Sequence, residues 1–167
     1  MSALTLAKRA IIEFESLELQ AYPDPGSNDG LPWTIGYGNI TMGGVPVQPG
    51  DTVTKEKAEQ MLDEYLHTLD AFMAKNVPDW GLLSEGQAAA LLDFAYNVGE
   101  QTFLPSGTGV INRIVQNKLW DCVSSAMLLY VKGANGKPLA GLKRRRVFDA
   151  ALFAGYSYEK AMTIVII

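Results

Sequence analysis

Apolar side chains recur at helical spacing in the first segment of the chain. They stand three or four positions apart, at Leu4, Ala7, Ile11 and Phe14. Residues at this spacing lie on one face of an α-helix. The pattern predicts an amphipathic helix over residues 3–17.

The same periodicity returns over a longer stretch after the turn-forming pair Pro49 and Gly50. One helical face carries Ala58, Met61, Leu62, Tyr65, Leu69, Phe72 and Met73. This stretch predicts a helix over residues 55–75, which would be the longest element of the chain. His67 falls on the opposite, polar face, so we expect it to be exposed.

Another helix is marked by the residues at its two ends. Ser84 and Gln87 stand three residues apart ahead of an apolar run, as in a capping box, and Gly99 follows the run. A helix between Ser84 and Gly99 is therefore predicted. Apolar periodicity predicts three more helices, over residues 108–117, 119–131 and 139–154.

Short apolar pieces replace the helical pattern over residues 19–47. Two of them, 19–22 and 33–37, are flanked by Pro, Gly, Asn and Asp, which is typical of strands joined by tight turns. We predict a small β-meander here.

The order of these elements indicates an α+β fold that is mostly helical. A helix, a β-meander and a long helix precede an all-helical remainder, so we expect two lobes within one domain over residues 1–167. The small lobe would span about 15–54, and the long helix at about 55–75 would bridge it to a helical lobe. That larger lobe would comprise about 76–167 together with the first helix.

The composition fits a single domain with an ordinary core. Of the 167 residues, 48% are apolar and 19% are charged. No apolar run approaches the roughly 20 residues that cross a membrane, so we expect no stable membrane insertion. The first residues lack the basic-then-apolar order of a secretory signal, and we expect no export signal.

The single cysteine and the single histidine limit the chemistry further. Cys122 cannot form an internal disulfide, and its place in the apolar run 120–130 predicts a buried side chain. A zinc site built on imidazole and thiolate would need several carboxylates to complete it. We therefore predict no metal.

Charge is divided unevenly along the chain. Residues 1–100 carry fifteen Asp and Glu against five Lys and Arg, whereas residues 101–167 carry three against nine. A basic half suits an anionic polymer such as nucleic acid, teichoic acid or a carboxylate-bearing glycan, with a merely solvated surface as the alternative. The basic run 143–146 has no interleaved aromatic residues for base stacking, so we expect no nucleic acid as a partner.

The turn-rich segment after the first helix concentrates carboxylates. Hydrolysis of a glycosidic bond needs one carboxylic acid to protonate the leaving oxygen and one carboxylate to activate water or stabilise positive charge. Glu15 and Asp24 could form such a pair. From spacing alone, Glu13, Glu18 and Asp29 remain alternatives.

A longer pattern around these carboxylates resembles a known family. Residues 14–26, followed by 32–38, resemble the Glu, Asp, Thr signature of the phage-type lysozymes, the endolysins of glycoside hydrolase family 24. Downstream, residues 91–99 and Phe103 are similar to the buried helix of the family's large lobe. Gly133 to Leu142, followed by Arg145, Arg146 and Asp149, are similar to its closing pattern.

The resemblance assigns roles to three residues. It implies that Glu15 is the general acid, that Asp24 orients or activates water, and that the Thr34 hydroxyl helps to hold that water. One of the arginines at 144–146 is expected to pair with Glu15. The candidate substrate-binding residues are Trp33, Tyr96 and Asn97.

The sequence departs from the family pattern at a few positions. Asn39 stands where the family usually has a histidine with a structural role, Ser16 replaces a usual glycine, and Asp149 replaces a usual glutamate. The loop 27–31 lengthens the connection between Asp24 and Thr34, and we expect it to reshape the rim of the cleft. No departure removes a catalytic group.

The resemblance implies a muramidase that cleaves the β-1,4 bond between N-acetylmuramic acid and N-acetylglucosamine in bacterial peptidoglycan and so lyses the host cell. Such an enzyme is expected to need no cofactor. We expect a monomer that resides in the cytoplasm of an infected bacterium and reaches the wall once a pore-former opens the membrane. The basic run 143–146 would contact the wall or stabilise a helix.

Two alternatives remain. One is a catalytically weak wall-binding or tail-associated module, which would have no need to keep Glu15, Asp24 and Thr34 together. The other is a lytic transglycosylase, which uses one acid and no water, so that Asp24 and Thr34 favour hydrolysis. We have no functional account of the apolar run 163–167, which we expect to pack as a strand or an extended tail.

Overall fold

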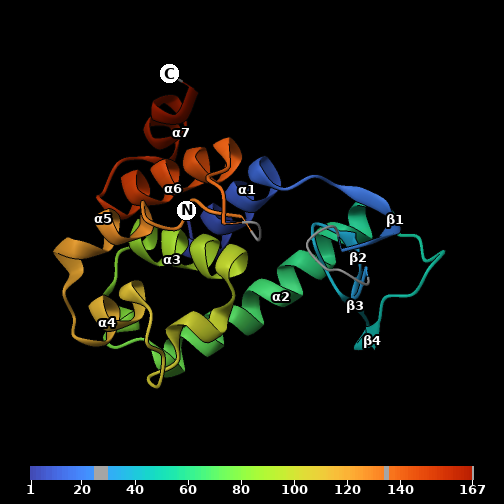
Figure 1. Ribbon diagram of the computed structural model, residues 1–167, viewed down its shortest axis with the longest axis horizontal. Coiled ribbons are helices and arrows are strands. Elements are labelled where there is room, and N and C mark those ends of the chain that lie inside the picture. The colour runs from blue at the N-terminus through green and yellow to red at the C-terminus, as the bar shows by residue number, and fades with distance from the viewer. Residues whose placement is uncertain (25–29, 134–135, 167) are drawn as a thin grey trace. The chain divides into compact units, whose positions relative to one another are not determined.

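The computed structural model describes residues 1–24, 30–133 and 136–166 (Figure 1). Its internal contacts divide the chain into two units. The small unit is Lys8–Leu66, and the large unit is Met1–Ala7 together with His67–Ile167. The boundary between them falls within the two helices α1 (Ala3–Phe14) and α2 (Lys55–Asn76). The architecture is α+β and mostly helical, as the sequence predicts.

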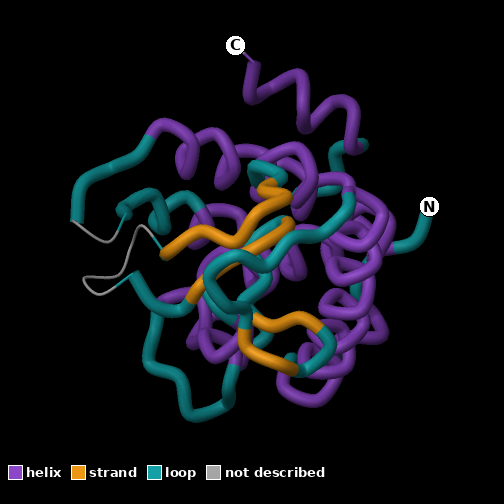
Figure 2. The backbone as a smooth tube through the Cα atoms, turned by 90° about the vertical axis from the view of Figure 1, so that its right-hand side faces the viewer, coloured by secondary structure: helices purple, strands orange, loops and turns teal. Residues whose placement is uncertain are grey.

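The small unit contains two antiparallel strand pairs. β1 (Glu18–Pro23) pairs with β2 (Trp33–Gly36), and β3 (Thr41–Met42) pairs with β4 (Val45–Pro46). Figure 2 draws the two pairs as separate orange segments. The predicted antiparallel strands with short connections are present, arranged as two separate pairs.

Backbone geometry after β2 explains why its ladder does not continue into β3. Gly36 and Gly38 adopt φ values of 68° and 105°, and the Ile35 N–H donates to the Asn39 carbonyl at 2.9 Å. These positive φ values turn the chain back on itself at once. A Cβ on Gly36 would also lie 3.3 Å from Ala58 Cβ on α2, so glycine serves both the turn and the packing.

An apolar cluster stabilises the small unit. Ile35, Val47 and Met61 are buried, and partly buried side chains surround them: Ala21, Trp33, Met42 and Val53. The cluster joins both strand pairs to α2, as apolar burial of this kind requires. It provides a rigid support for β1 and β2, which carry the candidate site.

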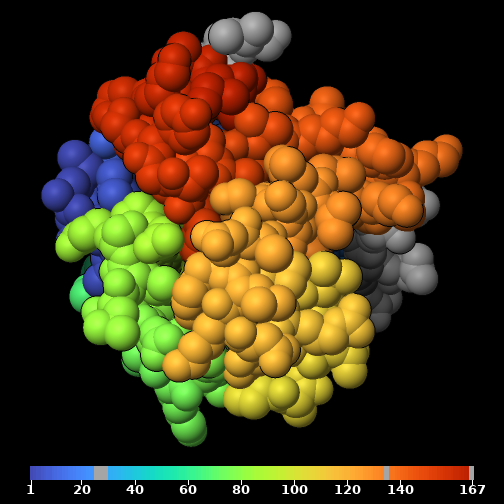
Figure 3. All heavy atoms as spheres, turned by 90° about the vertical axis from the view of Figure 1, so that its left-hand side faces the viewer, coloured from blue at the N-terminus to red at the C-terminus, as the bar shows by residue number. Residues whose placement is uncertain are grey.

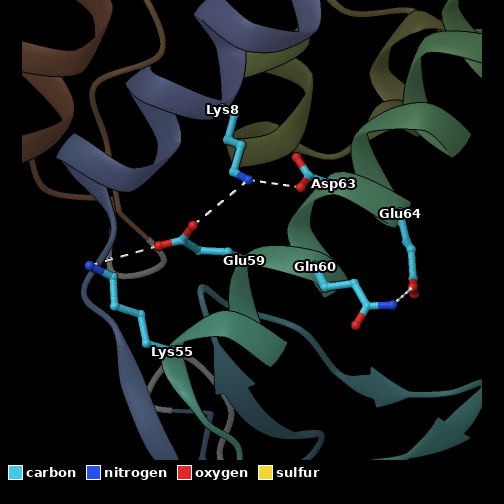
Figure 4. Close-up of polar contacts among 6 residues, drawn as sticks. All are labelled: Lys8, Lys55, Glu59, Gln60, Asp63 and Glu64. Carbon is cyan, nitrogen blue, oxygen red and sulfur yellow. Dashed lines mark hydrogen bonds and ion pairs between the residues drawn. The ribbon is translucent and has the colours of Figure 1, made fainter.

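Ion pairs connect α1 to α2 within the small unit (Figure 4). Lys8 Nζ lies 2.8 Å from Asp63 Oδ2 and 3.9 Å from Glu59 Oε2, and Lys55 Nζ lies 3.8 Å from Glu59 Oε1. Such solvent-accessible pairs each contribute at most about 1 kcal/mol. They help to orient the two helices, whereas apolar burial supplies the stability.

The large unit is helical. Its further elements are η1 (Trp80–Leu82), α3 (Glu85–Val98), η2 (Glu100–Phe103), α4 (Val110–Gln116), η3 (Trp120–Cys122), α5 (Val123–Met127), α6 (Ala140–Phe153) and α7 (Tyr158–Ile166). α3 is the central helix, with every residue from 88 to 95 buried. α4 and α5 lie side by side on the surface shown in Figure 3.

The ends of α3 are as predicted. The Ser84 side chain accepts a hydrogen bond from the Gln87 N–H, and the Gln87 side chain accepts one from the Ser84 N–H. The Gly99 N–H donates to the Ala95 carbonyl, with Gly99 at φ 91°. The capping box and the terminal glycine are both confirmed.

Two predictions for the helical part are wrong. The helix predicted over 119–131 is a 3₁₀ turn, η3, followed by the short α5, and Cys122 is exposed. A 3₁₀ turn has three residues per turn, so apolar positions counted at α-helical spacing misplace the side chain of Cys122. The buried positions are Val123, Ala126 and Met127.

The second concerns the C-terminal run, whose described residues 163–166 form the end of α7 instead of a strand or an extended tail. Ala161 and Val165 stand four residues apart and are buried, as one face of an α-helix requires. The Ser157 side chain accepts from the Lys160 N–H at its start. Within the described part of the chain, no helix is both long and apolar enough to span a membrane.

Candidate active site

Glu15 directly follows α1 and extends its last turn. The Glu15 N–H donates to the Ile11 carbonyl at 2.8 Å, so the backbone of the glutamate is held by the helix that precedes it. Its side chain is half-buried. The carboxyl group thus combines a fixed backbone with partial access to solvent.

Asp24 directly follows β1 and is also half-buried. The Asp24 N–H donates to the Gly30 carbonyl at 3.1 Å, which brings the two ends of the intervening segment together. Most of the loop 27–31, for which we predict an effect on the cleft rim, lies outside the described residues.

Thr34 lies on β2 and is only 8% exposed. Its hydroxyl donates to the Pro32 carbonyl oxygen at 3.5 Å. In the β1–β2 ladder, Thr34 stands directly opposite Tyr22. Opposed side chains of an antiparallel pair lie next to each other on the same face of the sheet.

Tyr22 connects the three candidate catalytic residues. Burial raises the pKa of the Tyr22 phenol above its ordinary value, and the negative charges of Glu18, Glu15 and Asp24 raise this pKa further. Tyr22 is therefore next to Thr34 in the ladder, and the charges of Glu15 and Asp24 both act on its phenol.

No sequence pattern singles out Tyr22 as a site residue. The available signal was its position two residues before Asp24, at the end of an expected strand, because alternate residues of a strand share a face. Without the register of the β1–β2 pair, that signal could not connect Tyr22 to Thr34.

Trp33 points away from this group. Successive residues of a strand face opposite sides, and Trp33 packs against the apolar cluster of the small unit. It also lines a pocket of about 530 Å³ with Leu31, Pro32, Pro46, Val47, Gln48 and Pro49. Its predicted role in substrate binding stays a prediction.

Tyr96 and Asn97 lie near the end of α3 in the large unit. Asn97 lines a pocket of about 490 Å³, whose other lining residues include Thr102, Leu129, Tyr130 and Lys132. Arg146 Nη2 donates to Asn97 Oδ1 at 2.5 Å. A guanidinium can only donate, so this contact fixes the direction of the Asn97 amide. The substrate-binding roles of both residues stay predictions.

A cluster of buried charges supports α3 and α6. Arg145 donates to both carboxylate oxygens of Asp93 at 2.9 Å. Arg146 Nη1 lies 3.1 Å from Asp149 Oδ2, and its guanidinium lies 4.5 Å above the Phe94 ring. All four charged side chains are almost completely buried.

The pKa values of the two aspartates of this cluster are shifted in opposite directions. Although burial alone would raise it, the pKa of Asp93 is lowered by the charge and hydrogen bonds of Arg145. Burial and the negative charge of Asp93 raise the pKa of Asp149 well above its ordinary value. Of the two carboxyl groups, Asp149 is therefore the one that holds a proton more readily.

The cluster also divides the basic run 143–146. Arg145 and Arg146 are buried and serve the interior of the large unit, whereas Lys143 and Arg144 are exposed on the same helix. Among the described residues, no group of three or more His, Cys, Asp and Glu is arranged to hold a metal ion.

Comparison with known proteins identifies the family. The family model described as "Phage lysozyme" matches residues 12–148. Among curated proteins, the endolysin of Bacillus phage PZA is 29% identical over 143 residues, which cover 86% of this chain and 51% of the endolysin. This chain thus spans about half the length of that relative.

Solved structures give the same family and fold. An endolysin from Escherichia coli O157:H7 phage FAHEc1 matches with a TM-score of 0.73 and 29% identity, covering 95% of this chain and 96% of its own. The muramidase domain of SpmX from Asticaccaulis excentricus has the same TM-score and identity, with 90% and 95% covered. With the family match over most of its length, the chain belongs to the phage lysozyme family.

Proposed function

We propose that this chain is a muramidase that hydrolyses the β-1,4 bond between N-acetylmuramic acid and N-acetylglucosamine in bacterial peptidoglycan. Family membership supports a lysozyme-type reaction. The observation that carries the proposal is that Thr34 stands opposite Tyr22 in the β1–β2 ladder, and that the charges of Glu15 and Asp24 both act on the Tyr22 phenol. Hydrolysis of a glycoside needs two carboxyl groups, and a hydroxyl can help to hold the attacking water.

The three residues have separate tasks in the proposed reaction. Glu15 donates its proton to the glycosidic oxygen, which leaves with the electron pair of the broken C–O bond. A water oxygen forms the new bond to the anomeric carbon and gives its proton to Asp24. Thr34 accepts a hydrogen bond from that water, because its own proton is donated to Pro32.

This arrangement requires an inverting mechanism. Room for a water between the carboxylate and the sugar needs the carboxyl groups of Glu15 and Asp24 about 6.5–9.5 Å apart, whereas a nucleophilic aspartate needs about 5–5.5 Å. A hydroxyl that holds water is of little use to a covalent intermediate, so Thr34 favours inversion.

Binding and biological setting complete the proposal. Tyr96, Asn97 and, on the other face of β2 from Thr34, Trp33 are the proposed contacts to the substrate, and the exposed Lys143 and Arg144 would attract the anionic wall. The relatives include phage endolysins, which supports a role in host lysis. We propose that the protein acts from the cytoplasm once the membrane is opened.

Mass spectrometry of the fragments that the purified protein releases from peptidoglycan tests the proposal. Reducing N-acetylmuramic acid ends are the expected result. Anhydro ends would mean a lytic transglycosylase, and an absence of fragments would mean a wall-binding module. Either of these outcomes would contradict the proposed hydrolysis.

A further inference from the structure

We propose that Tyr22 holds the attacking water together with Asp24 and Thr34, by donating its phenolic O–H to the water oxygen. This inference rests on the proposed function. It gives Tyr22 a positioning role in addition to the proposed roles of Glu15, Asp24 and Thr34. It follows from the register of one strand pair and from the hydrogen-bonding capacity of the groups around it.

The position of Tyr22 is fixed by the sheet. Tyr22 and Thr34 stand opposite each other in the β1–β2 ladder, and Pro23 and Trp33 form the next pair. The cross-strand neighbours share a face, with Cβ atoms about 4.5–5.5 Å apart. Asp24 follows two residues after Tyr22, and Thr34 is buried beside them. The Tyr22 phenol therefore lies on the same face of the β1–β2 pair as Thr34, where we propose that the water is held.

The charges around Tyr22 determine what its hydroxyl can do. Burial and the carboxylates of Glu18, Glu15 and Asp24 keep the phenol protonated, because they raise its pKa above the ordinary value. A neutral phenol beside these groups is not a base. It acts as a hydrogen-bond donor, and a half-buried tyrosine hydroxyl requires a partner.

The attacking water has one hydrogen-bonding position for which the Tyr22 O–H is a suitable donor. A water molecule has two protons and two lone pairs. An ionised Asp24 only accepts, and Thr34 uses its proton on the Pro32 carbonyl, so these two residues receive both water protons. One lone pair attacks the anomeric carbon. The other needs a donor, and Tyr22 is the O–H group that the ladder places next to Thr34.

Loss of this donor has a chemical consequence beyond a slower reaction. A water held by two acceptors alone can rotate out of line, and misplacement of a reacting group lowers the rate. Glu15, having given its proton to the leaving oxygen, is then a carboxylate on the face of the sugar where the 6-hydroxyl also lies. That hydroxyl can attack the oxocarbenium-like anomeric carbon in place of water, with its proton passing to Glu15. The product of that attack is an anhydro sugar.

The test uses Tyr22→Phe in the full chain, with Tyr65→Phe as the matched control, because Tyr65 is a second tyrosine of the small unit on α2. Phe keeps the ring and removes one oxygen. We expect kcat on purified peptidoglycan to fall roughly tenfold, the loss typical of one hydrogen bond. We also expect the share of anhydro ends, measured by mass spectrometry, to rise at least severalfold for Tyr22→Phe alone.

The product ratio separates a positioning role from a structural one, because it does not depend on how much of the variant is folded. An unchanged ratio in Tyr22→Phe would overturn the inference and leave the proposed hydrolysis intact. If the wild-type chain released no reducing ends, the proposed function itself would fail. A Thr34→Val, Tyr22→Phe double variant adds a further check, since two residues that hold one water give effects on kcat that are less than additive.

Discussion

The buried charges of the large unit allow one prediction to be worked out in full. Arg145 donates two hydrogen bonds to Asp93, and their side chains are 4% and 0% exposed. Arg145→Met keeps an unbranched apolar side chain about as long as the aliphatic stem of arginine and removes the guanidinium, so Asp93 is left charged and buried. Removal of one partner from a buried ion pair costs about 3–5 kcal/mol. We expect the free energy of unfolding to fall by that amount.

Asp93→Asn removes the other partner and is expected to cost less. The charge of Asp93 is one of the causes that raise the pKa of Asp149. Once Asp93 is neutral, Asp149 ionises more easily and can supply the negative charge that the two guanidinium groups require. The remaining cost arises because Arg145 then donates to a neutral amide in place of a charged carboxylate. We expect this loss to be about 1.5–3 kcal/mol.

Urea unfolding at neutral pH, followed by circular dichroism and tryptophan fluorescence, measures both variants. The slopes of the free energy against urea concentration must match the wild-type slope for the comparison to hold. The reasoning is refuted if Asp93→Asn lowers the free energy of unfolding as much as Arg145→Met or more, because Asp149 would then not take over the charge.

Three further outcomes are expected. Ser84→Ala removes the side-chain cap of α3 and should lower the free energy of unfolding by about 1 kcal/mol in urea, with no change expected in Ser84→Asp. Since the folded chain holds a proton on Asp149 that the unfolded chain releases near pH 4, stability should fall as pH rises from there through the raised pKa. Asp149→Asn should remove that fall, and urea unfolding at a series of pH values checks it. Lastly, lysis of cell walls should weaken with added salt, because screening acts over about 8 Å at physiological ionic strength, and Lys143→Gln should reduce that dependence in turbidity assays.

Local features of the fold could be predicted from sequence. The capping box at Ser84, the glycine after α3 and the apolar face of α2 each depend on residues a few positions apart. The failures arose where local geometry departs from a regular period. Cys122 sits in a 3₁₀ turn, and Gly36 at the end of β2 with Gly38 just after it turn the chain so that the strands form two separate pairs.

The site required contacts that no short pattern contains. Asp93 and Arg145 are 52 positions apart along the chain, and their pairing depends on how α3 packs against α6. Tyr22 and Thr34 are joined only by strand register. The sequence could therefore suggest Glu15, Asp24 and Thr34 through the family pattern, whereas the phenol beside them became visible only in three dimensions.

The most direct test of the central claim is the rate at which Glu15→Gln releases reducing ends from purified peptidoglycan. Glu13→Gln is the matched control, because Glu13 is an exposed carboxylate on α1 only two residues away. Loss of a positioned general acid typically lowers the rate about 10²- to 10⁴-fold. The account predicts such a loss for Glu15→Gln with unchanged folding, and wild-type activity for Glu13→Gln. Retention of more than about a tenth of the activity by folded Glu15→Gln would contradict it.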